Sequence, residues 1–354
     1  MSIVKLLFFV CFDYVRDQLN ELSTLLIVKR VVFKTNSIHF VILNFIVYLY
    51  LHIRIYMQPK INSCKSTEIR DNICMVIEVS HESPISILEH SLTYNDYAYA
   101  LVHLFETHPR YYNFYKNLTE CSDVPVLLDN SIFELGKSFE PKEYVKWIER
   151  LKPNYYIVPD VLECCDGTIN AWDNWMTYWT DRTNALGDGA LKIGVVQGKD
   201  WNDLVRCYQY ISSHADYVAI SFDYSYYEHT GRVTTTSAGR KLQLWCSGRQ
   251  RFIHQLIDEG IWRWDKPHHL LGCSLAKEFS YYVDNNIHNI KSVDTSNPVV
   301  ASIKGCRYND TFGLEHKPST ILADLIEHEF TDDQLEDLEH NTKMFKKILK
   351  RDGY

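Results

Sequence analysis

Four apolar segments of the chain each end in acidic or amide residues, and these residues are the first candidates for chemistry. With their terminal residues, the segments are 126–129 (Asp129), 156–160 (Asp160), 193–198 (Gln197 and Gly198) and 290–294 (Asp294). Carboxylates can act as nucleophiles, acids or bases, and an amide can both donate to and accept from a ligand. A barrel of parallel strands gathers such groups at the carboxyl ends of its strands. The pattern therefore predicts an enzyme with its site at one end of an α/β barrel.

The segments between these residues favour the same (β/α)8 architecture. Short apolar runs alternate with amphipathic stretches, which is typical of consecutive βα units. We expect strands at 74–80, 124–129, 155–160, 192–198, 217–221, 269–273 and 290–294, with 299–303 as the candidate eighth strand. We expect helices at 94–118, 141–151, 168–186, 201–214, 243–259 and 275–285. Acidic residues that arrive from several strands favour a closed barrel over an open sheet, which concentrates its site at one switch point.

Composition and charge limit the classes of protein to consider. The chain has 354 residues, 46% of them hydrophobic and 23% charged, which fits a globular protein of one barrel with additions. The formal net charge of −8 provides no global basic field, so any contact with nucleic acid must use local patches. The 10 cysteines contain no C-x-x-C pair, which favours reduced thiols in a cytoplasmic protein.

The first 57 residues differ in composition from the rest. This stretch is rich in Ile, Leu, Val, Phe and Tyr and contains neither Gly nor Pro. Three interpretations stay open: an upstream extension with the true start at Met57, a membrane anchor, or an ordered accessory element. We divide the chain into this apolar extension (1–57), a barrel (58–317) and a helical C-terminal segment (318–354).

The ordered set of motifs resembles the tRNA-guanine transglycosylase superfamily over roughly residues 70–305. The resemblance implies a TIM barrel that exchanges guanine for a 7-deazaguanine base through a covalent aspartyl intermediate. It assigns Asp294 as nucleophile, Asp129 as acid/base and Phe133, four residues after Asp129, as the ring that stacks on the base. The remaining base-binding positions that it implies are Asp160, Gln197, Gly198, Gly272, Cys273 and Glu278.

Two departures from the family pattern bear on the substrate. Cys273 stands where the family has a second glycine in the base-binding turn. The family's zinc site is absent, since only Cys306 and His316 lie in the corresponding region and two ligands cannot complete a tetrahedral site. We therefore expect no metal and no other cofactor. The chain looks more like the branch, found in phages and bacterial gene islands, that inserts a 7-deazaguanine base such as preQ0 or preQ1 into DNA.

Local positive charge is available for a polymeric substrate. One basic stretch follows three tyrosines and is the expected nucleic-acid contact: Arg232, Arg240, Lys241, Arg249 and Arg251. DNA is the expected partner, and a zinc-free enzyme acting on tRNA is the alternative. A non-catalytic nucleic-acid-binding barrel and an unrelated barrel enzyme for a small molecule are two further alternatives. A homodimer is compatible with all of them.

Overall fold

The structure is a computed structural model that describes residues 76–179, 189–231, 240–273, 275–309, 313–314 and 322–349. The apolar extension, the expected start at Met57, Arg232 and His316 lie outside these residues. Among the described residues, no helix is both long and apolar enough to cross a bilayer.

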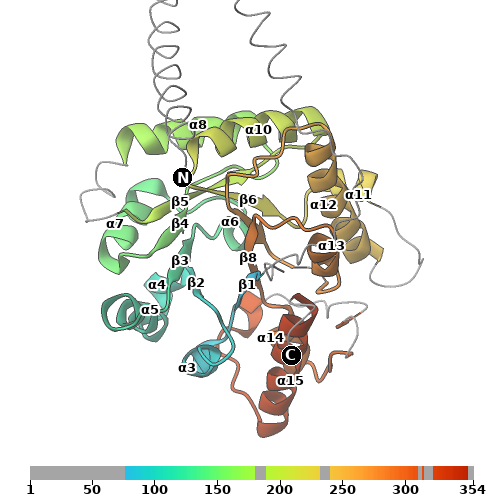
Figure 1. Ribbon diagram of the computed structural model, residues 1–354. Helices are drawn as coiled ribbons and strands as arrows, with labels where there is room; N and C mark the ends of the chain where they lie inside the picture. The colour runs from blue at the N-terminus through green and yellow to red at the C-terminus, as the bar shows by residue number, and fades with distance from the viewer. Residues whose placement is uncertain are drawn as a thin grey trace, which may run out of the picture. The chain divides into compact units, whose positions relative to one another are not determined.

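Eight parallel strands form one curved sheet in the order β1-β8-β7-β6-β5-β4-β3-β2 (Figure 1). The strands are β1 (Glu78–His81), β2 (Ala98–Leu101), β3 (Val126–Asp129), β4 (Tyr155–Ile157), β5 (Leu191–Val196), β6 (Tyr217–Ser221), β7 (His268–Leu271) and β8 (Ile290–Thr295). Because β1 and β8, which lie far apart in sequence, pair with each other, the sheet forms a nearly closed barrel. The expected (β/α)8 architecture is therefore confirmed.

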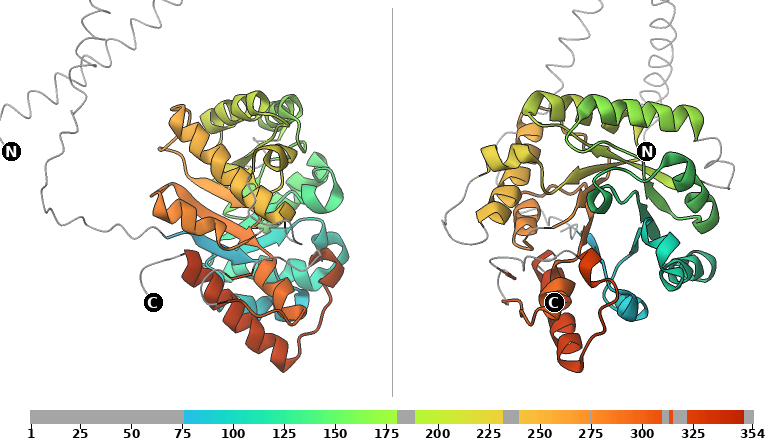
Figure 2. Two further views of the ribbon diagram at one scale, coloured as in Figure 1. Left: turned by 90° about the vertical axis from the view of Figure 1, so that its right-hand side faces the viewer. Right: turned by 180° about the vertical axis from the view of Figure 1, so that it is seen from behind.

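Helices surround the sheet, as two further views show (Figure 2). They are α3 (Leu88–Ser91), α4 (Leu104–Thr107), α5 (Pro109–Cys121), α6 (Ile132–Leu135), α7 (Pro141–Leu151), α8 (Cys165–Tyr178), α10 (Trp201–His214), α11 (Ser225–Thr230), α12 (Arg240–Asp258), α13 (Glu278–Asp284), α14 (Asn297–Ile303) and α15 (Asp332–Leu349), with 3₁₀ turns η1 (Ile85–Ile87) and η2 (Leu322–Leu325). Local signals fix several helix starts. Proline occupies the first turn of α5 and α7, and Asp200 caps α10 by accepting a hydrogen bond from the Asp203 amide at 3.0 Å.

The barrel is open between β1 and β2, and side chains bridge this seam. Asp96 Oδ2 accepts from the Val79 amide at 3.0 Å, and Asn95 Oδ1 accepts from the His81 amide at 2.7 Å. On the outside, Lys346 of α15 forms an ion pair with Asp96 at 2.8 Å. The C-terminal helix therefore stabilises the edge that direct strand pairing leaves open.

Two predicted elements were wrong. Residues 94–118 do not form one helix, because β2 occupies Ala98–Leu101 and the helices α4 and α5 follow it. All four residues of β2 are buried, so this strand lacks the polar alternation that would have revealed it. Residues 299–303 are helical and belong to α14, which begins next to Pro298. The missing eighth strand is thus β2 and not the segment near residue 300.

Candidate active site at the carboxyl ends of the strands

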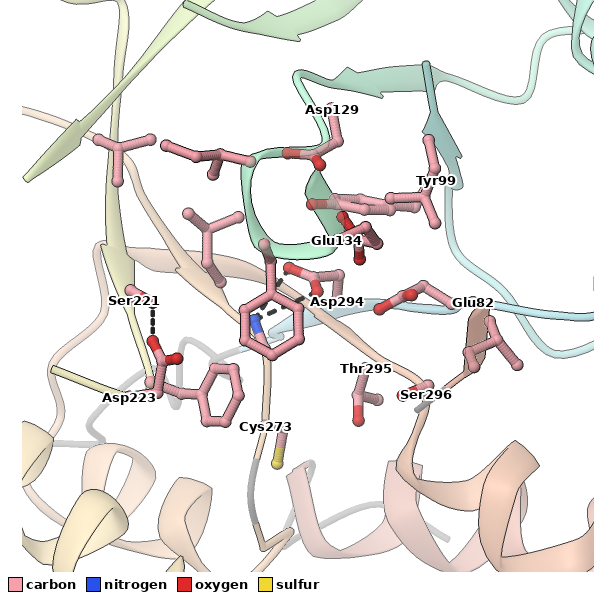
Figure 3. A pocket seen from close by; sticks show the side chains of 18 of the residues that line it. Glu82, Tyr99, Asp129, Glu134, Ser221, Asp223, Cys273, Asp294, Thr295 and Ser296 are labelled. Atoms are coloured by element: carbon pink, nitrogen blue, oxygen red, sulfur yellow. Dashed lines mark hydrogen bonds between the residues drawn. The ribbon is translucent and has the colours of Figure 1, made fainter. Parts of the chain in front are cut away.

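A cavity of about 200 Å³ lies at the carboxyl ends of the strands (Figure 3). The four strand-end residues Asp129, Asp160, Gln197 and Asp294 all line it, as the pattern predicted. Phe133, Gly272 and Cys273 line it as well. None of the described lining residues is Lys, Arg or His. Six carboxylic acids line this space: Glu82, Asp129, Glu134, Asp160, Asp223 and Asp294. The cavity is therefore strongly acidic.

Asp294, near the end of β8, receives three hydrogen-bond contacts. The Gly272 amide donates to both of its carboxylate oxygens, at 3.1 and 3.2 Å. The His269 Nε2 atom lies 3.0 Å from its Oδ1. Gly272 has a φ of +66°, and a Cβ there would lie 2.3 Å from the ring of Phe222, so only glycine fits without rearrangement. These contacts fix the direction of the carboxylate.

Asp129, at the end of β3, has a different environment. Its Oδ2 accepts one hydrogen bond, from the Ser131 amide at 2.8 Å, and Ser131 adopts a left-handed backbone conformation with a φ of 58°. Burial, above all, raises the pKa of Asp129 well above its usual range, and the neighbouring Glu134 and Asp294 raise it further. Asp129 is thus a buried carboxyl group that binds a proton readily.

Glu134 extends the acidic cluster beside Asp129. Burial and the nearby Glu82 raise the pKa of Glu134 to about 8. In Figure 3, Asp129, Glu134 and Asp294 lie around the same part of the cavity as Tyr99. Like charges at such sites cannot all ionise without a large energetic penalty, so the cluster retains protons at neutral pH.

Asp160 and Gln197 form one hydrogen-bonded unit. Gln197 Nε2 donates to Asp160 Oδ2 at 2.7 Å, and Asn130 Nδ2 donates to Asp160 Oδ1 at 2.8 Å. Gln197 Oε1 accepts from the Glu163 amide at 2.8 Å. Burial raises the pKa of Asp160 to about 6, although the two amide donors oppose the rise. Gln197 therefore holds Asp160 in place, and any ligand must share hydrogen bonds that these groups already make.

A row of aromatic rings leads from the cavity to the surface. Phe133, about half exposed, lies 5.9 Å from Phe222, measured between ring centroids. Phe222 meets Trp245 of α12 edge-on at 5.4 Å, and the Lys241 ammonium lies 4.6 Å from the centroid of the Trp245 ring. The start of α12, which carries Lys241, is thus connected to Phe133 by two successive ring contacts, Trp245–Phe222 and Phe222–Phe133.

Three expected contacts lie away from the cavity. Gly198 packs against the start of α10, where a Cβ would come within 2.7 Å of the Leu204 amide nitrogen, so its small size serves packing. Glu278 and Arg249 are both buried and form an ion pair, with Arg249 Nε 2.7 Å from Glu278 Oε1. The expectation that Arg249 contacts nucleic acid was therefore wrong. Glu278 is likewise occupied by this pair and does not line the cavity.

The other basic residues of this stretch are placed differently. Arg240, Lys241 and Arg251 are exposed on α12, and Arg232 lies outside the described residues. Lys241 also forms an exposed ion pair with Glu228 at 3.0 Å, which is a weak interaction in water. These three exposed side chains stay candidates for phosphate contact.

The strand-end pattern missed several cavity residues. Asp223 follows β6 by two residues, and the same rule that selected Asp129 would have found it; burial raises its pKa. Tyr99 was missed because β2 was not predicted. Glu82 directly follows β1, so the strand-end rule would have found it as well. Glu134 lies a full turn beyond β3, on α6, where a carboxylate is usually a surface residue.

Comparison with known proteins adds no family assignment. Neither a search against protein-family models nor a search of curated protein sequences found a match. Among the described residues, no group of three or more His, Cys, Asp or Glu side chains is arranged to hold a metal ion. The function is therefore argued from the geometry of the cavity.

Proposed function

We propose that the protein is a DNA-guanine transglycosylase, which exchanges guanine in DNA for a 7-deazaguanine base. The observation that carries this proposal is the contrast between its two central carboxylates. Asp294 is held in one direction by the Gly272 amide and His269 Nε2, whereas burial and neighbouring acids favour the protonated form of Asp129. Carboxylates with opposed environments divide into a nucleophile and an acid in enzymes that cleave glycosidic bonds.

The two groups are sufficient for a balanced exchange. The Asp294 carboxylate attacks C1′ of the nucleotide, the C1′–N9 bond breaks, and guanine leaves with a proton supplied by Asp129. The incoming base then returns a proton to Asp129, its N9 attacks C1′, and the ester to Asp294 breaks. One glycosidic bond replaces another, so the reaction requires no external energy source.

The cavity suits one nucleobase. Its volume of about 200 Å³ is below the roughly 300–1,000 Å³ of pockets for drug-sized ligands. Phe133 offers a ring on which a base can stack, and the Asp160–Gln197 unit offers acceptors for the N–H groups of a purine edge. A base within a duplex can reach such a cavity only by leaving the stack.

The charge distribution agrees with a polymeric substrate whose base alone enters. Acidic cavity walls repel phosphates, and the exposed Arg240, Lys241 and Arg251 lie on α12, whose Trp245 contacts the cavity residue Phe222. If Lys241 contacts a phosphate, Lys241→Ala should weaken DNA binding by a similar factor for all sequences. It should also reduce the slope of log affinity against log salt by about 1. Lys152→Asn serves as the control, because Lys152 is exposed just before β4, at the other end of the barrel.

The proposal is tested by following radiolabelled guanine into duplex DNA, single-stranded DNA and tRNA in parallel. Incorporation into DNA supports the proposal, and incorporation only into tRNA selects the zinc-free tRNA enzyme instead. The acidic walls also favour a competing proposal, an enzyme for a small cationic molecule. Failure of every nucleic acid to take up label would leave that competing proposal in place.

A further inference from the structure

A polar chain runs through the barrel interior beneath the cavity and ends at Asp294. His269 Nε2 lies 3.0 Å from Asp294 Oδ1, and His269 Nδ1 lies 2.8 Å from Ser292 Oγ. Ser292 Oγ in turn lies 3.3 Å from the Tyr217 hydroxyl. Tyr217 is the first residue of β6, whereas Asp294 is near the end of β8, so the chain connects the two ends of the barrel.

The strand register explains this alignment. Alternate residues of a strand point to the same face, so Ser292 and Asp294 of β8 both face the interior. His269 pairs with Ser292 between the neighbouring strands β7 and β8, which brings the imidazole alongside both side chains. The rings of Tyr97, which directly precedes β2, and Tyr99, on β2, each lie 6.4 Å from the imidazole between centroids, and His269 is fully buried. Packing and hydrogen bonds thus hold the imidazole beside Asp294.

Hydrogen-bond chemistry sets the direction of the chain. An ionised Asp294 can only accept, so the proton must sit on His269 Nε2. With this one proton on the ring, Nδ1 is an acceptor for the Ser292 hydroxyl, and Tyr217 can donate to Ser292. This arrangement gives every polar atom in the chain a partner. A Ser-His-Asp hydrolase is not indicated, because Asp294 lines the cavity and Ser292 does not.

We propose that His269 is a positioning residue that holds the Asp294 carboxylate in its attacking orientation, with Ser292 and Tyr217 fixing the histidine tautomer. This role rests on the proposed function, in which Asp294 is the nucleophile. His269 does not touch the substrate, since it lies beneath the carboxylate and does not line the cavity. Its contribution is to restrict Asp294 to one orientation before the substrate arrives.

The test compares two substitutions of His269 with one at its neighbour. His269→Phe keeps a ring but removes the donor, and we expect kcat for guanine exchange to fall about 10²-fold with little change in KM. His269→Gln can place an amide donor near the former Nε2 and should recover at least tenfold of that loss. The matched control is His268→Phe, because His268 is equally buried but faces the helices, stacked 3.8 Å from Trp262 between centroids. This control should reduce thermal stability and leave kcat of the folded protein unchanged.

A second measurement reads the contact without requiring turnover. Long-range nitrogen–proton correlation spectra should show His269 as the Nε2–H tautomer in the wild type. The same signal should change in Asp294→Asn and in Ser292→Ala. A His269 observed as the Nδ1–H tautomer would overturn the proposed chain. Equal kcat for His269→Phe and His268→Phe would overturn the positioning role while leaving the transglycosylase proposal intact. A wild type that exchanges no guanine would overturn that proposal itself, and the role of His269 with it.

Discussion

The molecule buries carboxylates in two very different ways. Glu278, buried at the start of α13, has a full complement of partners: Arg249 contacts both of its oxygens, at 2.7 and 3.0 Å, and the Tyr282 hydroxyl donates at 2.6 Å. The cavity carboxylates have no basic side chain among the described lining residues. The same fold therefore pairs a buried carboxylate with an arginine where it serves structure, and gathers acidic groups without a basic lining residue around the cavity. Uncompensated buried acids reduce stability, and their presence in a cavity indicates a functional role.

The Arg249–Glu278 ion pair also supports the loop that contacts Asp294. Arg249 Nη2 donates to the Gly272 carbonyl at 3.0 Å, and Nη1 donates to the Leu271 carbonyl at 2.9 Å. Gly272 is the residue whose amide donates to Asp294. The Arg249–Glu278 ion pair thus fixes the loop whose Gly272 amide orients Asp294. The buried ion pair and the cavity are therefore mechanically linked.

The largest effect is expected for Asp294→Asn. This change keeps the shape of the side chain but removes the carboxylate that we propose as the nucleophile, so exchange should fall by on the order of 10⁴-fold or more. Stability should change little, because the amide still accepts from Gly272. Exchange kinetics and a thermal unfolding curve measured on the same preparation check both statements. Activity that survives this substitution would remove the covalent mechanism.

Asp129→Asn should cause the next largest loss. Proton transfer by a positioned acid contributes roughly 10²–10⁴-fold, and the amide cannot supply the proton that guanine needs to leave. In the wild type, kcat should decrease as rising pH removes the proton from Asp129, and this alkaline decrease should be absent from the residual activity of the variant. The control is Asp123→Asn, since Asp123 is exposed just before β3, at the other end of the barrel. A pH–rate profile of Asp129→Asn that matches the wild type would contradict the assignment.

Arg249→Met tests the structural side of the comparison. Removing one partner of a buried ion pair leaves the other charge unpaired, which typically costs about 3–5 kcal/mol in the free energy of unfolding. Arg251→Met, two residues along the same helix and exposed, should change it by less than about 0.5 kcal/mol. Urea unfolding of the two variants measures the difference. Equal effects would mean that the buried pair is not what stabilises the loop at Gly272.

The burial of Arg249 could have been predicted from the sequence. The buried residues Cys246, Arg249, Ile253 and Leu256 recur at helical spacing along α12 and place the arginine on the apolar stripe. The strand-end rule correctly brought Asp129, Asp160, Gln197 and Asp294 to one cavity, because it depends on local sequence and barrel topology alone. The pairing of His269 with Asp294 was out of reach, since it depends on the register between β7 and β8. The polar Glu278 could not be matched to Arg249 without knowing how α12 and α13 pack.

The smallest expected effect is on the pH dependence of stability. The pKa of Glu134 is about 8 in the folded protein and about 4.3 for an unperturbed glutamate, so the folded state binds more protons between these values. The contribution of Glu134 to the free energy of unfolding is fully present below about pH 4 and is lost as the pH rises toward 8. Melting temperature should therefore decrease from pH 5 to pH 8, and Glu134→Gln should make this decrease shallower. A decrease of the same slope in the variant would show that Glu134 is not the group responsible.

The central claim is that Asp294 forms a covalent bond with the sugar, and the adduct can be observed directly. Wild-type protein is incubated with a guanine-containing oligonucleotide, quenched with acid, digested and examined by peptide mass spectrometry. We predict a sugar–DNA adduct on the peptide that carries Asp294, which disappears when excess free guanine is added and never forms in Asp294→Asn. Exchange of labelled guanine with no adduct on Asp294, or with an adduct on another residue, would contradict the claim.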